Sequence, residues 1–72
     1  MTDGNAKLHM LAHSTINGRG IWHYMFESEL IPIHVVQYEA KGFEVHTFMF
    51  TSDQQADKKY NAISLKMVKG QL

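Results

Sequence analysis

Residues 33–52 read IHVVQYEAKGFEVHTFMFTS, the densest run of β-branched and aromatic residues in the chain. Residues of these types favour strands, and a short segment that ends in glycine is typical of a hairpin loop. We therefore predict two strands, over 33–39 and 43–51, joined by a three-residue loop at 40–42. The alternative is a short helix that has Pro32 as its first residue and ends at Gly42, which would change the order of elements to ββαβα.

The predicted hairpin is apolar on both faces. Alternation along the strands puts one set of side chains on one face: Val36, Tyr38, Glu44, His46, Phe48 and Phe50. The other face would carry Ile33, Val35, Phe43, Val45, Thr47 and Met49. One helix covers only one face of a four-stranded sheet, and large apolar patches that stay exposed usually mark protein interfaces. We predict a protein-binding surface on this hairpin, formed by Val36, Tyr38, His46, Phe48 and Phe50. The alternative is that a loop, the N-terminal arm or a helix over 33–39 covers the apolar surface.

The segment 7–27 predicts a first hairpin. Apolar and polar residues alternate over 7–15 and again over 21–27, and the sequence between them, INGRG, is a strong turn signal. A two-residue loop at Asn17 and Gly18 would pair Trp22, Tyr24 and Phe26 with His9, Leu11 and His13. A three-residue loop shifts the register by one residue and pairs the same aromatic residues with Leu8, Met10 and Ala12. We prefer the three-residue loop, because it collects the large apolar side chains on one face.

The last segment predicts a helix. Ser52 followed three residues later by Gln55 is a capping box, and Gly70 marks the end. Between them an apolar stripe recurs at helical spacing: Ala56, Tyr60, Ile63 and Met67. Four strands followed by one helix predict an α+β fold, a four-stranded antiparallel β-meander with the C-terminal helix packed on one face. The chain would form a single small domain over 1–72, with 1–6 flexible.

Composition limits the classes of function. The chain has 72 residues, of which 44% are hydrophobic and 19% charged, with no cysteine and a formal net charge of zero. Without cysteine there is no disulfide and no thiolate metal site. A neutral chain argues against a dedicated nucleic-acid binder, because such domains are usually basic. No apolar run reaches the roughly 20 residues of a membrane span, and no signal-peptide pattern is visible. We predict a soluble cytoplasmic protein.

The five histidines do not predict a metal site. In the preferred register His9, His13 and His23 would share the outer face of the first hairpin. Residues four apart on a strand are about 13 Å apart, which is too far for His9 and His13 to share one ion. No carboxylate or cysteine stands at ligand spacing from them. We expect neither a metal ion nor a cofactor.

No motif predicts catalysis. The serines lack the context of a nucleophile elbow. Gly18-Arg19-Gly20 precedes a strand, whereas a phosphate-binding loop opens a helix. A domain this small also has little room for an active-site pocket. We predict that the protein is not an enzyme.

A set of basic residues offers an alternative binding surface. Four lysines fall within about 100° of arc on the predicted helix, and an arginine stands at the tip of the first hairpin; the set is Arg19, Lys58, Lys59, Lys66 and Lys69. Such a set contacts phosphates in nucleic-acid binders. Four lysines give only weak binding, and the simpler interpretation is a solvated helix flank with cations near its C-terminal end.

Binding is the class of function that these observations favour. We predict a small non-enzymatic regulator that binds a larger protein or complex through the second hairpin. Small cysteine-free domains of this type occur among bacterial and phage modulators of host machinery, including the transcription apparatus. A weak nucleic-acid-binding protein and a homodimeric structural module are the alternatives.

Overall fold

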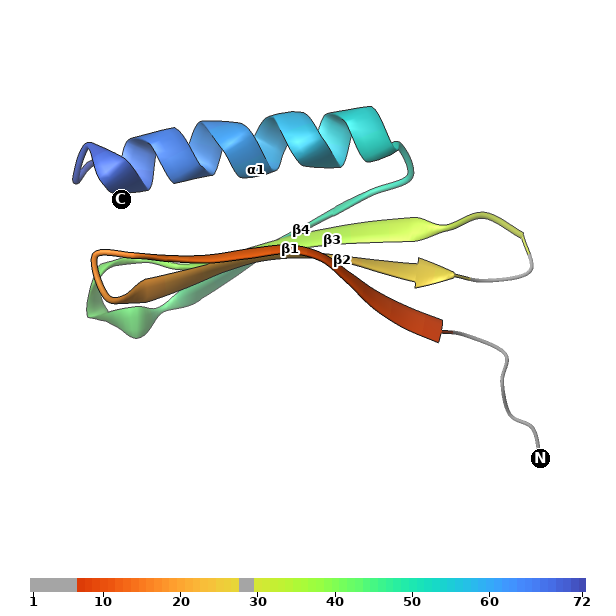
Figure 1. Cartoon of the computed structure of the whole chain (residues 1–72), viewed down its shortest axis with the longest axis horizontal. Coiled ribbons are helices and arrows are strands. Elements are labelled where there is room, and N and C mark those ends of the chain that lie inside the picture. The colour runs from red at the N-terminus through yellow and green to blue at the C-terminus, as the bar shows by residue number, and fades with distance from the viewer. Residues whose placement is uncertain (1–6, 28–29) are drawn as a thin grey trace.

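Four antiparallel strands pair in chain order, and a C-terminal helix lies along one face of the sheet they form (Figure 1). The computed structural model describes residues 7–27 and 30–72. The elements are β1 (Lys7–Ile16), β2 (Arg19–Glu27), β3 (Ile33–Glu39), a short 3₁₀ turn η1 (Lys41–Phe43), β4 (Val45–Phe50) and α1 (Asp53–Val68). The predicted α+β meander is therefore confirmed, and 33–39 is a strand, not the alternative helix. The segment 1–6, which we predicted to be flexible, lies outside the described residues.

The helix α1 begins and ends where the sequence predicts. Ser52 Oγ accepts a hydrogen bond from the Gln55 N–H at 3.3 Å, which caps the first turn. At the other end Gly70 has a φ of 73°, and its N–H donates to the Met67 carbonyl. The N–H of residue 71 donates to the carbonyl of residue 66, which completes a Schellman motif. Asn17 Nδ2 also donates to the Met67 carbonyl at 2.9 Å, so the tip of the first hairpin is tied to the end of α1.

The hydrophobic core lies between α1 and one face of the sheet, which we call the helix face. Its buried apolar side chains come from the predicted helix stripe and from β2 and β3: Ala56, Tyr60, Ile63, Met67, Ile21, Val36 and Tyr38. Tyr60 Oη donates to Ser14 Oγ at 3.2 Å, so its hydroxyl is paired. Burial of a large apolar side chain contributes about 1.5–3 kcal/mol. This single layer therefore supplies much of the hydrophobic stabilisation.

The first hairpin has a two-residue loop, so the predicted three-residue loop is wrong. Ile16 pairs with Arg19, and the φ values of Asn17 and Gly18 are 54° and 77°. Both central residues are left-handed, as a type I′ turn requires, and Asn-Gly adopts this turn readily. This local preference outweighs the grouping of large side chains on which the prediction relied.

A β-bulge in β1 restores part of the predicted pairing. The register shifts between Met10 and Ala12, with Leu11 as the extra residue. On the N-terminal side of the bulge, large side chains face each other as predicted, Leu8 with Phe26 and Met10 with Tyr24. Ala12 instead lies opposite His23, on the helix face. Because bulges bend a strand, the first part of β1 leans away from α1 (Figure 1).

The second hairpin has the predicted faces but a longer loop. Gly42 and Phe43 have φ values of 82° and 61°, and a left-handed residue cannot continue a strand, so β4 begins at Val45 and not at Phe43. Tyr38 pairs with His46, two residues further along than a loop at 40–42 would place it. A shift by two residues keeps each side chain on its face. The predicted division into two faces therefore holds for the residues of β3 and β4, whereas Phe43 and Glu44, predicted on the strand, precede β4.

Candidate functional site

The second face of the sheet is not covered by any described segment. Figure 1 shows α1 on one side of the sheet and no described element on the other. The strand register and the alternation of side chains assign this face in four rows across the strands. We call it the open face, and its rows are Leu8, Phe26 and Ile33; Met10, Tyr24, Val35 and Met49; His13, Trp22, Gln37 and Thr47; and Thr15, Gly20, Glu39 and Val45.

Large apolar side chains are exposed on the open face. They come from all four strands: Leu8, Met10, Phe26, Ile33, Val45 and Met49. Met49 is 71% exposed, the largest fraction among them. Large hydrophobic side chains scattered singly on a surface are ordinary, but a contiguous patch marks a binding site. Leu8, Phe26 and Ile33 lie in the row next to Tyr24 and Val35, and Met10 and Met49 lie in their own row, so these five form a patch, whereas Val45 lies two rows away.

Charge is nearly absent from the open face. Glu39 is the one carboxylate among its described side chains, and no lysine or arginine lies in its rows. Glu39 Oε1 accepts a hydrogen bond from the Gly20 N–H at 2.7 Å. Tyr24 Oη donates to Gln37 Oε1 at 2.7 Å, and Gln37 Nε2 donates to Thr47 Oγ1 at 3.1 Å. Because these polar groups already bond to one another, they can be covered by an apolar partner at a lower desolvation cost.

The predicted protein-binding residues lie on the helix face instead. Val36 is fully buried and Tyr38 is 8% exposed, because both pack in the core beneath α1. Phe48 and Phe50 are partly buried against the same core, and His46 stacks on Tyr38 with 5.1 Å between ring centroids. The interface placed on Val36 and Tyr38 is therefore corrected: α1 covers that face of the hairpin and leaves the opposite one open.

The predicted basic surface is assembled only in part. Arg19 is 8% exposed and its Nη1 has no hydrogen-bond partner, so it does not join the lysines on a surface. Lys58 and Lys59 border a shallow hollow between α1 and β4, and Lys59 Nζ lies 4.4 Å from the ring centroid of Phe48. That contact is a cation–π interaction, and it holds the ammonium against the domain itself. Lys66 and Lys69 are exposed near the end of α1.

The prediction that His9, His13 and His23 share one face of the first hairpin is wrong. His13 stacks on Trp22 on the open face, whereas His23 lies on the helix face. Two others form pairs with neighbouring carboxylates, His9 with Glu27 at 3.2 Å and His46 with Glu44 at 3.0 Å. His23 and His34 differ from the rest, because they are only 3% and 4% exposed.

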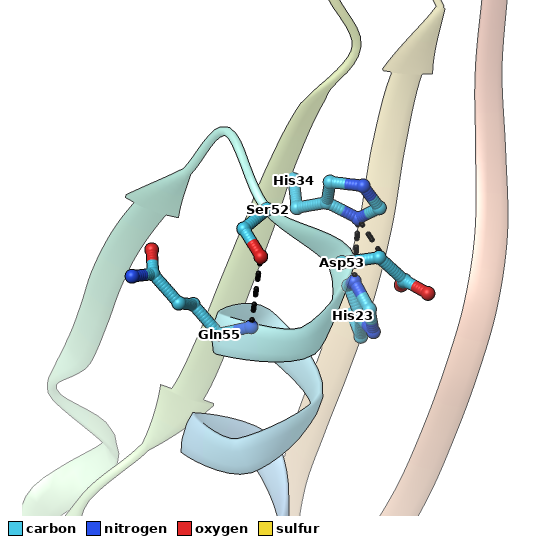
Figure 2. A network of polar contacts seen from close by, with 5 residues as sticks. All are labelled: His23, His34, Ser52, Asp53 and Gln55. Carbon is cyan, nitrogen blue, oxygen red and sulfur yellow. Dashed lines mark hydrogen bonds and ion pairs between the residues drawn. The ribbon is translucent and has the colours of Figure 1, made fainter.

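His23, His34 and Asp53 form a cluster at the start of α1. His23 of β2 and His34 of β3 turn toward each other on the helix face, and Asp53 lies beside them (Figure 2). The distance is 3.0 Å from His23 Nε2 to His34 Nδ1, and 3.8 Å from His34 Nδ1 to Asp53 Oδ1. All three side chains place a ligand atom within 4.8 Å of the others. The sequence carries no signal for this cluster, since its members stand on three separate elements.

Burial lowers the pKa of His23, and a positive charge on His34 would lower it further. Asp53 and Asp57 oppose this shift in the pKa of His23 and are the smaller effects. The His23 imidazole is therefore neutral at pH 7. One of the two facing ring nitrogens donates its proton to the other, and the tautomers decide which ring is the donor.

Comparison with known proteins gives no match to a family model, to a curated protein or to a solved structure. Within residues 7–27 and 30–72, no helix combines the length and the hydropathy that a membrane crossing needs. Two features of the molecule bear on its function, the open face and the cluster of His23, His34 and Asp53.

Proposed function

We propose that the protein is a small non-enzymatic regulator that binds a larger protein, with the open face as its docking surface. The observation that carries this proposal is the patch of exposed apolar side chains around Tyr24 and Val35, on a face nearly free of charge. The cores of protein interfaces have this composition, depleted in charge and enriched in aromatic residues and methionine. Met10 and Met49 border the patch, and methionine adapts its shape to a partner surface.

The expected partner brings a flat apolar surface of its own. The patch spans the sheet from β1 to β4, and a broad sheet face of this kind suits another packed surface better than a single inserted side chain. The described rows of the open face hold no lysine or arginine that could contact a phosphate backbone, which favours a protein over a nucleic acid. A second copy of the chain is the competing occupant, and the experiment below separates it from a larger partner.

We also propose where the protein acts and in which kind of process. A cytoplasmic location and a role in modulating host machinery, such as a bacterial transcription complex, are supported by the type of molecule alone. The chain has 72 residues, no cysteine and no formal net charge. A small domain without disulfides does not depend on an oxidising compartment.

The test compares two charge substitutions at exposed apolar residues. Met49→Glu places a carboxylate on the open face, whereas Leu65→Glu places one on α1, where Leu65 is 55% exposed. Sedimentation of the purified protein first establishes its oligomeric state. The wild type and both variants are then used to capture proteins from cells of the source organism, and the dissociation constant is measured with the purified partner.

We expect the wild type and Leu65→Glu to bind the partner equally. Met49→Glu should bind at least about tenfold more weakly, because a carboxylate buried without a partner costs more than the 1.4 kcal/mol that corresponds to this factor. Equal binding by all three proteins would mean that the interface lies elsewhere. A wild-type dimer that Met49→Glu converts to a monomer would assign the open face to a second copy and overturn the proposal of a larger partner.

A further inference from the structure

We propose that His23, His34 and Asp53 form a binding site for one divalent transition-metal ion, with Zn²⁺ as the ion that fits best. The site is independent of the open face, because its residues lie on the helix face and at the start of α1. The sequence predicts no metal ion, because only the spacing of His9, His13 and His23 on strands bears on one, whereas His34 and Asp53 stand on other elements.

Three elements bring their ligand atoms to one point. His23 and His34 stand in adjacent rows of β2 and β3, and their rings face each other with 3.0 Å between Nε2 and Nδ1. The cap at Ser52 starts α1 above these rows, which puts Asp53 Oδ1 at 3.8 Å from His34 Nδ1 (Figure 2). The two imidazoles are fixed by burial, whereas the Asp53 side chain is 76% exposed and able to rotate.

The distances suit tetrahedral coordination. Zinc binds imidazole nitrogen and carboxylate oxygen at about 2.0–2.2 Å, so neighbouring ligand atoms in a tetrahedral site stand about 3.4 Å apart. The observed separations of 3.0 Å and 3.8 Å lie on either side of this value, and none of the three exceeds 4.8 Å. A slight opening of the imidazole pair and a rotation of the Asp53 carboxylate would complete the geometry.

The donor set selects the class of ion. Two imidazoles and one carboxylate match zinc sites that have three protein ligands and leave the fourth position to water. Ca²⁺ and Mg²⁺ prefer oxygen ligands throughout, so they fit poorly. Imidazole also binds Ni²⁺ and Cu²⁺, so the site would accept these ions as well as Zn²⁺.

The local charge favours a cation. Asp57 follows Asp53 by one helical turn, and both carboxylates act electrostatically on His23. Their two negative charges outweigh the partial positive charge of about half a unit at a helix N-terminus. A divalent ion at the cluster would therefore be close to neutralised by the two carboxylates.

A bound ion would join β2, β3 and α1 directly. Small domains often rely on a metal or a disulfide to supplement a limited core, and this chain has no cysteine from which to form a disulfide. We therefore expect Zn²⁺ to raise the thermal unfolding midpoint of the protein.

The test titrates the purified protein with Zn²⁺ alone at pH 7 and follows it by calorimetry and by NMR of the histidine side chains. We expect one ion per chain, with resonance shifts at His23 and His34 and none at His9, His13 or His46. Asp53→Asn should weaken Zn²⁺ binding at least about tenfold, because loss of even an outer-shell partner of a metal ligand costs about 10–100-fold. The variant keeps the Ser52 cap and changes an exposed side chain, so it should fold.

The matched control is Glu27→Gln, which removes the carboxylate from a second pair of histidine and carboxylate, His9 and Glu27 at 3.2 Å. Its affinity for Zn²⁺ should equal that of the wild type. Shifts at the surface histidines in place of His23 and His34, or unchanged affinity in Asp53→Asn, would overturn the proposal. An equal loss of affinity in Glu27→Gln would do the same. These results are separate from binding at the open face, since neither substitution alters that face.

Discussion

Trp22 lies flat on the open face because the residue two positions before it has no side chain. A Cβ at Gly20 would overlap the outer edge of the indole, at 2.5 Å from Cζ2. The indole also stacks on His13, with 5.4 Å between centroids and 5° between planes. Glycine at this position is therefore required by the close approach of the indole, whereas Gly18 and Gly42 are favoured by positive φ.

We expect Gly20→Ala to destabilise the protein by about 1–3 kcal/mol, the range for a group inserted into a packed site. In an ordinary strand the same change would be favourable, because glycine weakens strands. Trp22 is the one tryptophan of the chain, so its fluorescence reports the displacement while urea unfolding measures stability. In a Trp22→Leu background the substitution should cost little. Equal costs in both backgrounds would show that the indole does not impose the glycine.

At the scale of elements, the sequence correctly predicts those features that depend on a local pattern of residues. The cap at Ser52, the apolar stripe and Gly70 are all signals within one segment, and α1 follows them closely. The bulge at Leu11 and the left-handed Phe43 are different, because each depends on how two strands meet. A bulge displaces half a strand by one residue, and alternation alone does not reveal where this occurs.

The sites are harder to predict than the elements, because they also depend on how separate elements meet. Both faces of the second hairpin are apolar, so alternation separates the faces without saying which one α1 covers. That choice depends on the fit of the helix stripe to Ile21 and Val36, which is a tertiary property. The cluster of His23, His34 and Asp53 requires the β2–β3 register and the starting point of α1 together. No spacing in the sequence encodes either.

The capping of α1 gives a prediction at this scale. Ser52→Ala removes the oxygen that accepts from the Gln55 N–H at 3.3 Å, and loss of such a cap costs about 1 kcal/mol. Thr51→Ala is the matched control, since it removes an adjacent exposed hydroxyl outside the helix. Urea unfolding should show a lower midpoint for Ser52→Ala and little change for Thr51→Ala. Equal effects of the two substitutions would contradict a specific role for the cap.

At the scale of the whole molecule, the described residues form one core layer and leave one sheet face that no described segment covers. Natural domains are stable by about 0.05–0.15 kcal/mol per residue, which for 72 residues is about 4–11 kcal/mol. With a reserve of this size, the loss of a single core side chain removes a large share of the stability. The exposed apolar side chains on the open face should contribute far less until a partner covers them.

Two methionines on opposite sides of the sheet test this asymmetry. Met67 of α1 is fully buried against the helix face, whereas Met49 of β4 is 71% exposed on the open face. Met67→Ala should cost about 2–5 kcal/mol, because it removes buried atoms and leaves a cavity, while Met49→Ala should stay within about 0.5 kcal/mol. Urea unfolding at two protein concentrations measures both. A large cost for Met49→Ala that grows with protein concentration would mean that a second copy already covers the open face. A small cost at both concentrations would leave that face free in the purified protein, as binding to a larger partner requires.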